Sequence, residues 1–148
     1  MNIPKIPDNS LTEEIKEIVS LCQQLESKYG AKSFSFAPPV NEEEFSDWEN
    51  KNGISIPETY KDWLRFSNGS DILSSLARFN GLQNFVVNSK IVPDDIVIIG
   101  TLVGDGELLC FLKQTGEIAR FLDGEIKITD FKAWLKNILI RILRDETY

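Results

Sequence analysis

The spacing of apolar residues near the N-terminus predicts a helix that runs from about Ser10 to Gly30. Ser10 is the expected N-cap and Glu13 the residue that completes a capping box, while Gly30 is the expected stop. The acidic side chains of the first turns are favoured by the helix dipole. The apolar positions recur every three or four residues, the period of one helix face: Leu11, Ile15, Ile18, Val19, Cys22, Leu25 and Tyr29.

Two short helices are predicted in the passage PPVNEEEFSDWENKNGISIPETYKDWLRFSNGS. In the first, Asn41 is the expected N-cap and Glu44 its capping-box partner. Phe45 and Trp48 are expected to face the core, and Gly53 to end the helix. The prolines and glycines of this passage therefore mark where helices begin and end.

The second of these helices is expected to begin at Pro57, because the first helical turn tolerates proline. Tyr60, Trp63 and Leu64 mark its apolar face. The pair Asn68-Gly69 is expected to close it. The next segment, DILSSLARFNGLQNF, fits either a helical turn or an irregular pair of strands.

From Ile91 the pattern becomes that of β structure. IVIIGTLV is a continuous apolar run, as in a central strand that is buried on both faces. Gly104-Asp105-Gly106 is a predicted turn into ELLCFL, and Gln114-Thr115-Gly116 a turn into EIARFL. Asp123-Gly124 before EIKI is a strong hairpin pattern. An antiparallel meander is the expected arrangement.

The last segment predicts a helix that is capped by Thr129 or Asp130. Helices, then strands, then a helix are typical of the α+β class. We expect a single domain, residues 1–148, with an N-terminal helix and extended extension over residues 1–37 and a core over residues 38–148. Its sheet would be antiparallel or mixed, with about four to six strands and the helices packed on it. The apolar stripe of the last helix comprises Phe131, Trp134, Leu135, Ile138, Leu139, Ile142 and Leu143.

The composition argues against several kinds of active site. The chain has no histidine, which removes Ser-His and Cys-His nucleophiles and every histidine-containing metal site. Cys22 and Cys110 lie far apart within apolar patterns, as free thiols of a reducing compartment do. Asp94-Asp95 and Asp105 lack the ligand spacing of a calcium loop. We expect no enzyme, no cofactor and no metal. With no signal peptide and no apolar run of membrane-spanning length, we expect a cytoplasmic protein.

The net charge of −7 is concentrated in residues 1–60, which hold eleven acidic and five basic side chains. Such a surface repels nucleic acid and membranes and attracts a basic protein. Acidic side chains also keep small proteins soluble, so charge alone leaves both interpretations open.

A proline and an acid-rich short helix are followed by GI-x-IP-E-x-Y-K-x-W-L and SNG. This ordered series of motifs resembles the SUKH superfamily, the domain of yeast cell-wall assembly regulators and many bacterial proteins. The later strands match in Ile99-Gly100, Gly104-Asp105 and Cys110-Phe111, and TDFKAWL resembles the closing helix. The segment between Gly69 and Ile91 lacks a tryptophan that is often present in the family. The matching residues of the first part are Pro39, Glu42, Glu43, Phe45, Gly53, Ile54, Ile56, Pro57, Tyr60, Trp63, Leu64, Asn68 and Gly69.

The resemblance implies an α+β domain without known catalysis, and bacterial members of the family are largely immunity proteins. We therefore expect a protein that captures a cognate toxin with a basic surface, often a nuclease, and acts as a monomer or weak dimer. A regulatory interaction module is the alternative. From charge and expected exposure, the candidate partner-binding residues are Glu42, Glu43, Glu44, Asp47, Asp71, Asp94, Asp95 and Asp105. Expected structural positions are Pro39, Trp48, Gly53, Pro57, Tyr60, Trp63, Leu64, Asn68, Gly69, Gly104 and Trp134.

Overall fold

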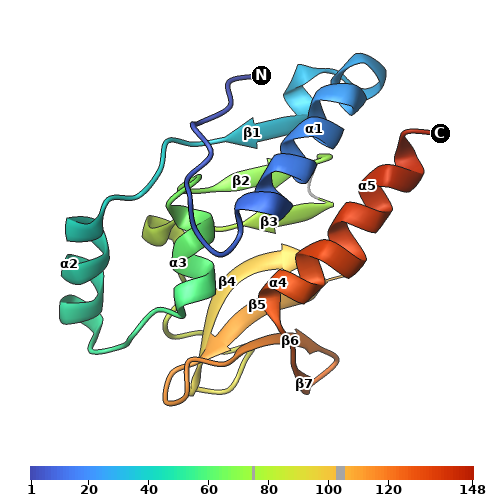
Figure 1. The fold of residues 1–148 in the computed structure, drawn as a ribbon. Helices are drawn as coiled ribbons and strands as arrows, with labels where there is room; N and C mark the ends of the chain where they lie inside the picture. The colour runs from blue at the N-terminus through green and yellow to red at the C-terminus, as the bar shows by residue number, and fades with distance from the viewer. Residues whose placement is uncertain (75, 103–105) are drawn as a thin grey trace.

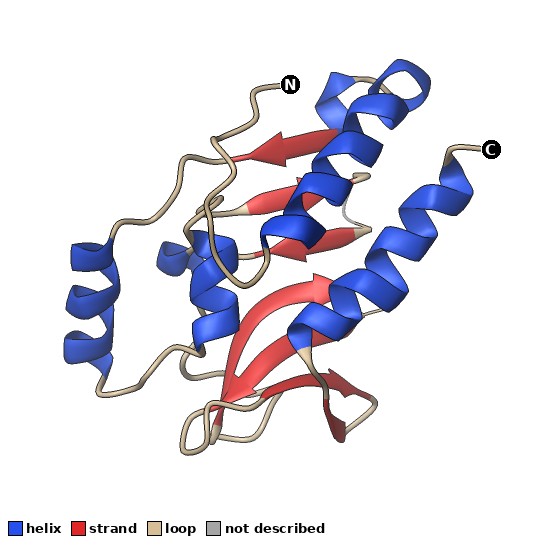
Figure 2. Ribbon diagram, viewed as in Figure 1, coloured by secondary structure: helices blue, strands red, loops and turns tan. Residues whose placement is uncertain are grey.

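The main helices lie on one face of a seven-stranded antiparallel sheet whose strands follow one another in chain order, β1 to β7 (Figure 1). The structure, a computed structural model, describes residues 1–74, 76–102 and 106–148. Helices α1, α3 and the C-terminal helix cover the sheet, whereas α2 lies to one side (Figure 2). The helices and helical turns are α1 (Thr12–Tyr29), η1 (Ala31–Ser33), α2 (Glu42–Asn52), α3 (Glu58–Leu64), η2 (Leu82–Asn84), α4 (Phe131–Trp134), η3 (Leu135–Leu139) and α5 (Ile140–Glu146).

The predicted α+β class with an antiparallel sheet is confirmed. The sheet has seven strands, whereas four to six were expected. Three of the seven have only three residues each, which is too short for a strand's alternating pattern to be recognised in the sequence. The strands are β1 (Phe34–Phe36), β2 (Ser70–Ile72), β3 (Ala77–Phe79), β4 (Ile96–Leu102), β5 (Glu107–Leu112), β6 (Ile118–Leu122) and β7 (Glu125–Ile128).

Strand β4 is the central strand, as its apolar run predicts. Its register with β5 shifts between Ile98 and Gly100. A side chain at Gly100 would bring its Cβ to 2.4 Å from the carbonyl oxygen of Arg78 on β3. Glycine at this position therefore allows β3 and β4 to approach closely.

The β6–β7 hairpin turns at Asp123 and Gly124, as predicted. Both residues have positive φ, 52° and 80°, as a two-residue type I′ turn requires. The turn predicted at Gly104-Asp105 lies outside the described residues.

The two faces of the sheet carry separate apolar clusters. The larger cluster joins the helices to the sheet. Helix α1 contributes six side chains to it, from Ile15 to Leu25, and the preceding Leu11 adds a seventh. On the opposite face a smaller cluster packs under the segment before β4. Its buried members are Val92, Ile96, Ile98, Cys110 and Ala119.

The predicted cap of α1 is wrong. Leu11 occupies the N-cap position, and no side chain caps the helix there. The Ser10 hydroxyl instead donates a hydrogen bond to the Asp62 carboxylate on α3. Gly30 ends the helix as expected. Tyr29 lies on the surface, 39% exposed, and its hydroxyl donates to Glu146.

The two short helices begin close to the predicted positions, and α2 also ends where predicted. Asn41 and Glu44 form the expected capping box, and Gly53 ends α2 with a left-handed φ of 65°. Pro57 occupies the N-cap of α3, one position before the first turn. Helix α3 ends at Leu64, earlier than predicted, and Asn68-Gly69 leads into β2. The ambiguous segment that follows contains both alternatives: strands β2 and β3, and then the turn η2.

The C-terminal helix contains a π-helical segment, Leu135–Leu139. Asp130 caps the helix by accepting a hydrogen bond from the Ala133 amide at 2.8 Å. The wider π turn shifts the apolar face, because it holds one more residue than an α turn. Ile138 is 37% exposed as a result, while Ile140, which the regular period leaves out of the stripe, is 1% exposed.

Candidate partner-binding surface

Helix α2 presents the densest group of acidic side chains on the surface. Phe45, 1% exposed, attaches this helix to the remainder of the protein. The Val40 amide donates to the Leu64 carbonyl at 2.9 Å, which joins the start of α2 to the end of α3. The first-turn residues Glu42, Glu43 and Glu44 and the following Asp47 are all exposed.

Glu42 is bound by Arg65 of α3. The Arg65 Nε lies 2.7 Å from Glu42 Oε1, and Nη2 lies 3.2 Å from Oε2. The same guanidinium pairs with Asp62 at 2.7 Å and Glu58 at 3.3 Å. The hydrogen bond from Arg65 lowers the pKa of Glu42 and raises that of Arg65. Part of the predicted acidic surface is therefore already paired within the protein.

Glu44 also has a structural role. Its carboxylate accepts from the Asn41 amide at 3.0 Å, and the Asn41 side chain accepts from the Glu44 amide at 2.9 Å. The capping pair satisfies backbone donors that a helix start leaves open. The remaining edge of the carboxylate faces solvent.

A groove runs between α2 and the turn η2. Trp48, in its wall, packs against the larger apolar cluster as predicted, but it is only half-buried. Its ring meets Phe85 edge-on at 5.3 Å. Carboxylates beside a partly exposed indole favour a cationic side chain, through charge and cation–π attraction. The groove is lined by Glu44, Asp47, Trp48, Lys51, Asn68, Leu82 and Gln83.

Two of the lining residues, Asn68 and Leu82, are in direct contact. The Asn68 side chain accepts a hydrogen bond from the Leu82 amide at 2.7 Å. A Cβ at Gly81 would lie 2.4 Å from the Asn68 carbonyl oxygen, so glycine permits this close approach. The sequence pattern did not assign Leu82 or Gln83 to a site, because their segment fits two structures equally well.

The other predicted partner-binding residues lie on different elements. Asp71 on β2 pairs with Arg78 on β3 at 2.9 Å. Asp94 and Asp95 are exposed just before β4. Asp105 lies outside the described residues. Of the eight candidates, the groove brings together Glu44 and Asp47, with Glu42 and Glu43 on the same helix.

Among the predicted structural positions that are described, Trp48 and Asn68 line the groove, and the others lie elsewhere in the fold. The Tyr60 hydroxyl donates to two carbonyls, those of Asn80 at 2.8 Å and Ile99 at 3.0 Å. Trp63 Nε1 donates to Ser70 Oγ at 3.2 Å. Leu64 is fully buried. Pro39 is exposed and Trp134 is buried under the C-terminal helix. Gly104 lies outside the described residues.

Metal-ligating groups and nucleophilic thiols were sought among the described residues. Within the described ranges, no three His, Cys, Asp or Glu side chains group closely enough to hold a metal ion. Burial raises the pKa of both the Cys22 and the Cys110 thiol to about 12, which opposes formation of a nucleophilic thiolate. Among the helices described, none combines the length and apolar character that a membrane span requires.

Comparison with known proteins gives two matches. The sequence model described as SMI1 / KNR4 family (SUKH-1) matches residues 39–137, which is about two thirds of the chain and includes α2, α3 and the sheet from β2 to β7. The chain is also 30% identical over 76 residues to an uncharacterised Bacillus subtilis (strain 168) protein, YnaB. That match covers 46% of this chain and 48% of the relative, so the chain spans about half the length of the curated relative.

Proposed function

Because the chain belongs to the SMI1 / KNR4 (SUKH-1) family, we propose that it is an immunity protein that binds and neutralises a cognate protein toxin. It acts in the cytoplasm by stoichiometric capture and carries out no reaction of its own. The single observation that carries this proposal is the groove beside α2, in which the carboxylates of Glu44 and Asp47 flank the half-buried indole of Trp48.

The chemistry of the groove defines the partner. A toxin that cuts nucleic acid needs a basic surface for its substrate. An arginine or lysine from that surface would lie between the two carboxylates and over the indole. The acidic residues of α2 would also accelerate encounter with such a partner. Occupying the basic surface excludes the nucleic acid.

Arg65 sets the direction in which the acidic surface faces. Its contact with Glu42 gives the α2 carboxylate that meets α3 a cationic partner, which the same guanidinium shares with Glu58 and Asp62 of α3. Glu43, Glu44 and Asp47 of the same helix are exposed. We place the toxin contact on that side.

The test is co-expression with the toxin domain encoded next to this gene, followed by calorimetry of the purified pair. Wild-type protein is expected to restore growth and to bind one to one. Asp47→Asn should weaken binding by about tenfold at low salt and by less at high salt, because added salt screens exposed charges. Trp48→Ala should weaken binding at both salt concentrations.

Asp145→Asn is the matched control, since Asp145 is an exposed aspartate on α5. Cells that die equally fast with and without the wild-type protein would refute the immunity role. Protection that survives both groove substitutions would keep the role and remove the groove from it. A pull-down that returns signalling proteins and no toxin would favour a regulatory interaction module instead.

A further inference from the structure

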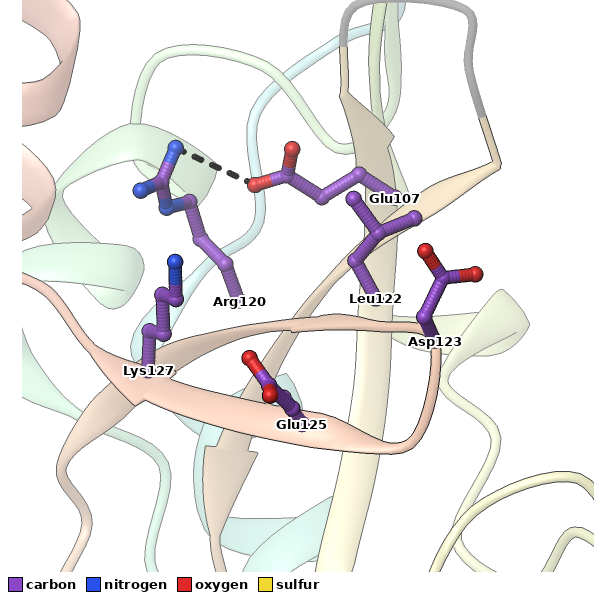
Figure 3. A pocket seen from close by; sticks show the side chains of 6 residues that line it. All are labelled: Glu107, Arg120, Leu122, Asp123, Glu125 and Lys127. Carbon is purple, nitrogen blue, oxygen red and sulfur yellow. Dashed lines mark ion pairs between the residues drawn. The ribbon is translucent and has the colours of Figure 1, made fainter.

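Arg120 of β6 lies between two depressions on the face of the sheet that carries the helices. The first is lined by side chains of β5, β6 and β7, and Figure 3 shows Arg120 and Lys127 rising from neighbouring strands toward Glu107. The second lies between β6 and the C-terminal helix. The described residues that line it include no carboxylate: Arg120, Thr129, Ala133, Trp134, Asn137 and Ile138.

Two buried N–H donors beside the second depression have no acceptor among the described residues. Arg120 uses Nη1 to pair with Glu107 Oε1 at 3.2 Å (Figure 3), but its buried Nε has no partner. Trp134 is 3% exposed, and its Nε1 also has no hydrogen-bond partner among the described residues. By contrast, Trp63 Nε1 has an acceptor in Ser70. Native proteins rarely leave buried donors unpaired, so the pair of donors points to an oxygen-bearing ligand.

The π-helical segment borders the same depression. Asn137 and Ile138 belong both to the segment Leu135–Leu139 and to the lining. A regular α-helix would turn Ile138 toward the core, whereas here it is 37% exposed. Single π turns occur frequently at functional sites. The helix thus departs from regular geometry where the unpaired donors lie.

The local charge disfavours a ligand with more than one negative charge. Arg120 and Lys127 supply two positive charges, but Glu107, Asp123 and Glu125 line the adjacent depression. A dianion such as phosphate would be repelled by these three carboxylates. A carboxylate group has two acceptor oxygens, which matches the two free donors.

We propose that the depression between β6 and the π segment binds a carboxylate that carries a short apolar group. Its oxygens accept from Arg120 Nε and Trp134 Nε1, and its apolar group lies against Ala133 and Ile138. The Arg120 side chain is 32% exposed, which leaves it room to move as the ligand enters. A short free carboxylic acid and the C-terminal residue of a peptide share this chemistry. The site is independent of toxin binding and lies outside the groove beside α2.

The test is a titration of ¹⁵N-labelled protein with sodium acetate and sodium butyrate at constant ionic strength, followed by ¹H–¹⁵N NMR spectra. The indole N–H of Trp134, assigned with Trp134→Phe, and the Nε–H of Arg120 should move downfield and saturate. The indole N–H of Trp63 should stay in place. Butyrate should bind more tightly than acetate, because its alkyl chain contacts Ile138.

Arg120→Gln should weaken butyrate binding by at least about tenfold. Arg141→Gln, a change at an exposed arginine of α5, should have no effect. If Arg120→Gln does not fold, Ile138→Glu takes its place, since a carboxylate on the rim should repel the ligand to a similar extent. If the indole N–H resonance of Trp134 does not move up to ~100 mM butyrate, the proposal is overturned. An unchanged affinity for butyrate in the folded Arg120→Gln or Ile138→Glu variant would also overturn it.

The two ligand sources are separated by N-acetylated trialanine with a free C-terminus and by its C-terminal amide. Tighter binding of the free peptide than of butyrate assigns the site to a chain terminus, and the reverse order assigns it to a small acid. Equal binding of the amide would contradict recognition of a carboxylate. Inorganic phosphate that competed as well as butyrate would contradict the preference for a single charge.

Discussion

Arg65, just after the last residue of α3, holds both carboxylate oxygens of Glu42 in the first turn of α2, at 2.7 and 3.2 Å. Its guanidinium also lies over the Phe45 ring, with Cζ 5.3 Å from the ring centroid. The arginine therefore connects the two short helices through charge and through packing. It also gives Glu42, which stays exposed, a cationic partner within the protein.

The Glu42–Arg65 pair makes a small, pH-dependent contribution to stability. Arg65 holds the pKa of Glu42 below its usual value. The contribution is thus complete above the unfolded pKa of about 4.3 and is lost as the pH falls through the folded pKa. Because Glu42 is largely exposed, Glu42→Gln should lower the free energy of unfolding by less than about 1 kcal/mol at pH 7. Urea denaturation at pH 7 and pH 3 measures the difference, which should be smaller at pH 3.

Glu43→Gln is the matched control on the same helical turn. Glu43 is exposed, and its removal should change stability by no more than about 0.5 kcal/mol at either pH. A loss for Glu42→Gln that persisted undiminished at pH 3 would show that the effect does not arise from the ionised pair.

The hydroxyl of Tyr60 is a second point where one side chain connects distant segments. It is fully buried and donates to the carbonyls of Asn80 and Ile99. Tyr60→Phe leaves both oxygens without this donor and should lower the free energy of unfolding by about 1–3 kcal/mol. Tyr29→Phe removes a hydroxyl that bonds an exposed carboxylate and should have a much smaller effect. Equal losses in the two variants, measured by urea denaturation, would contradict this assignment.

Features encoded by neighbouring residues could be predicted from the sequence. The capping box of Asn41 and Glu44 needs residues three positions apart, and the Asp123-Gly124 turn needs two adjacent residues with positive φ. In each case the chemistry is local, so the pattern is sufficient. The same holds for β4, whose apolar run reflects burial on both faces.

Features that depend on distant residues could not be predicted. Ser10 has the right type for a cap, but Asp62 from a distant helix competes for its hydroxyl. No local pattern shows that Arg65 faces Glu42 across two helices. Both Asp47 and Leu82 line the candidate groove. Asp47 could be predicted from its charge, whereas Leu82 lies in a segment whose apolar residues show neither a helix nor a strand period. Tertiary contacts decide these positions.

The two thiols should be unreactive in the folded protein. Burial raises the pKa of Cys22 and of Cys110 to about 12, so at pH 8 only a very small fraction is thiolate, the reactive form. A disulfide reagent that releases a coloured thiol should react slowly with native protein. It should react with both cysteines at once in denaturant. Fast reaction of one thiol under native conditions would show that its segment opens locally or that the thiol is exposed.

Gly100, within β4, should tolerate replacement poorly. Its Cβ would lie 2.4 Å from the Arg78 carbonyl, and the backbone of β3 cannot yield as a flexible side chain can. Gly100→Ala should therefore lower the free energy of unfolding by about 3 kcal/mol. Gly116→Ala is the control: Gly116 has a φ of 73° and open space around the added Cβ, so it should cost only about 1 kcal/mol of backbone strain. Urea denaturation gives both values, and hydrogen exchange should show faster opening of β3 in Gly100→Ala alone. Equal losses would mean that β3 and β4 can separate freely, and the close pairing of Phe79 with Gly100 would then contribute little to the sheet.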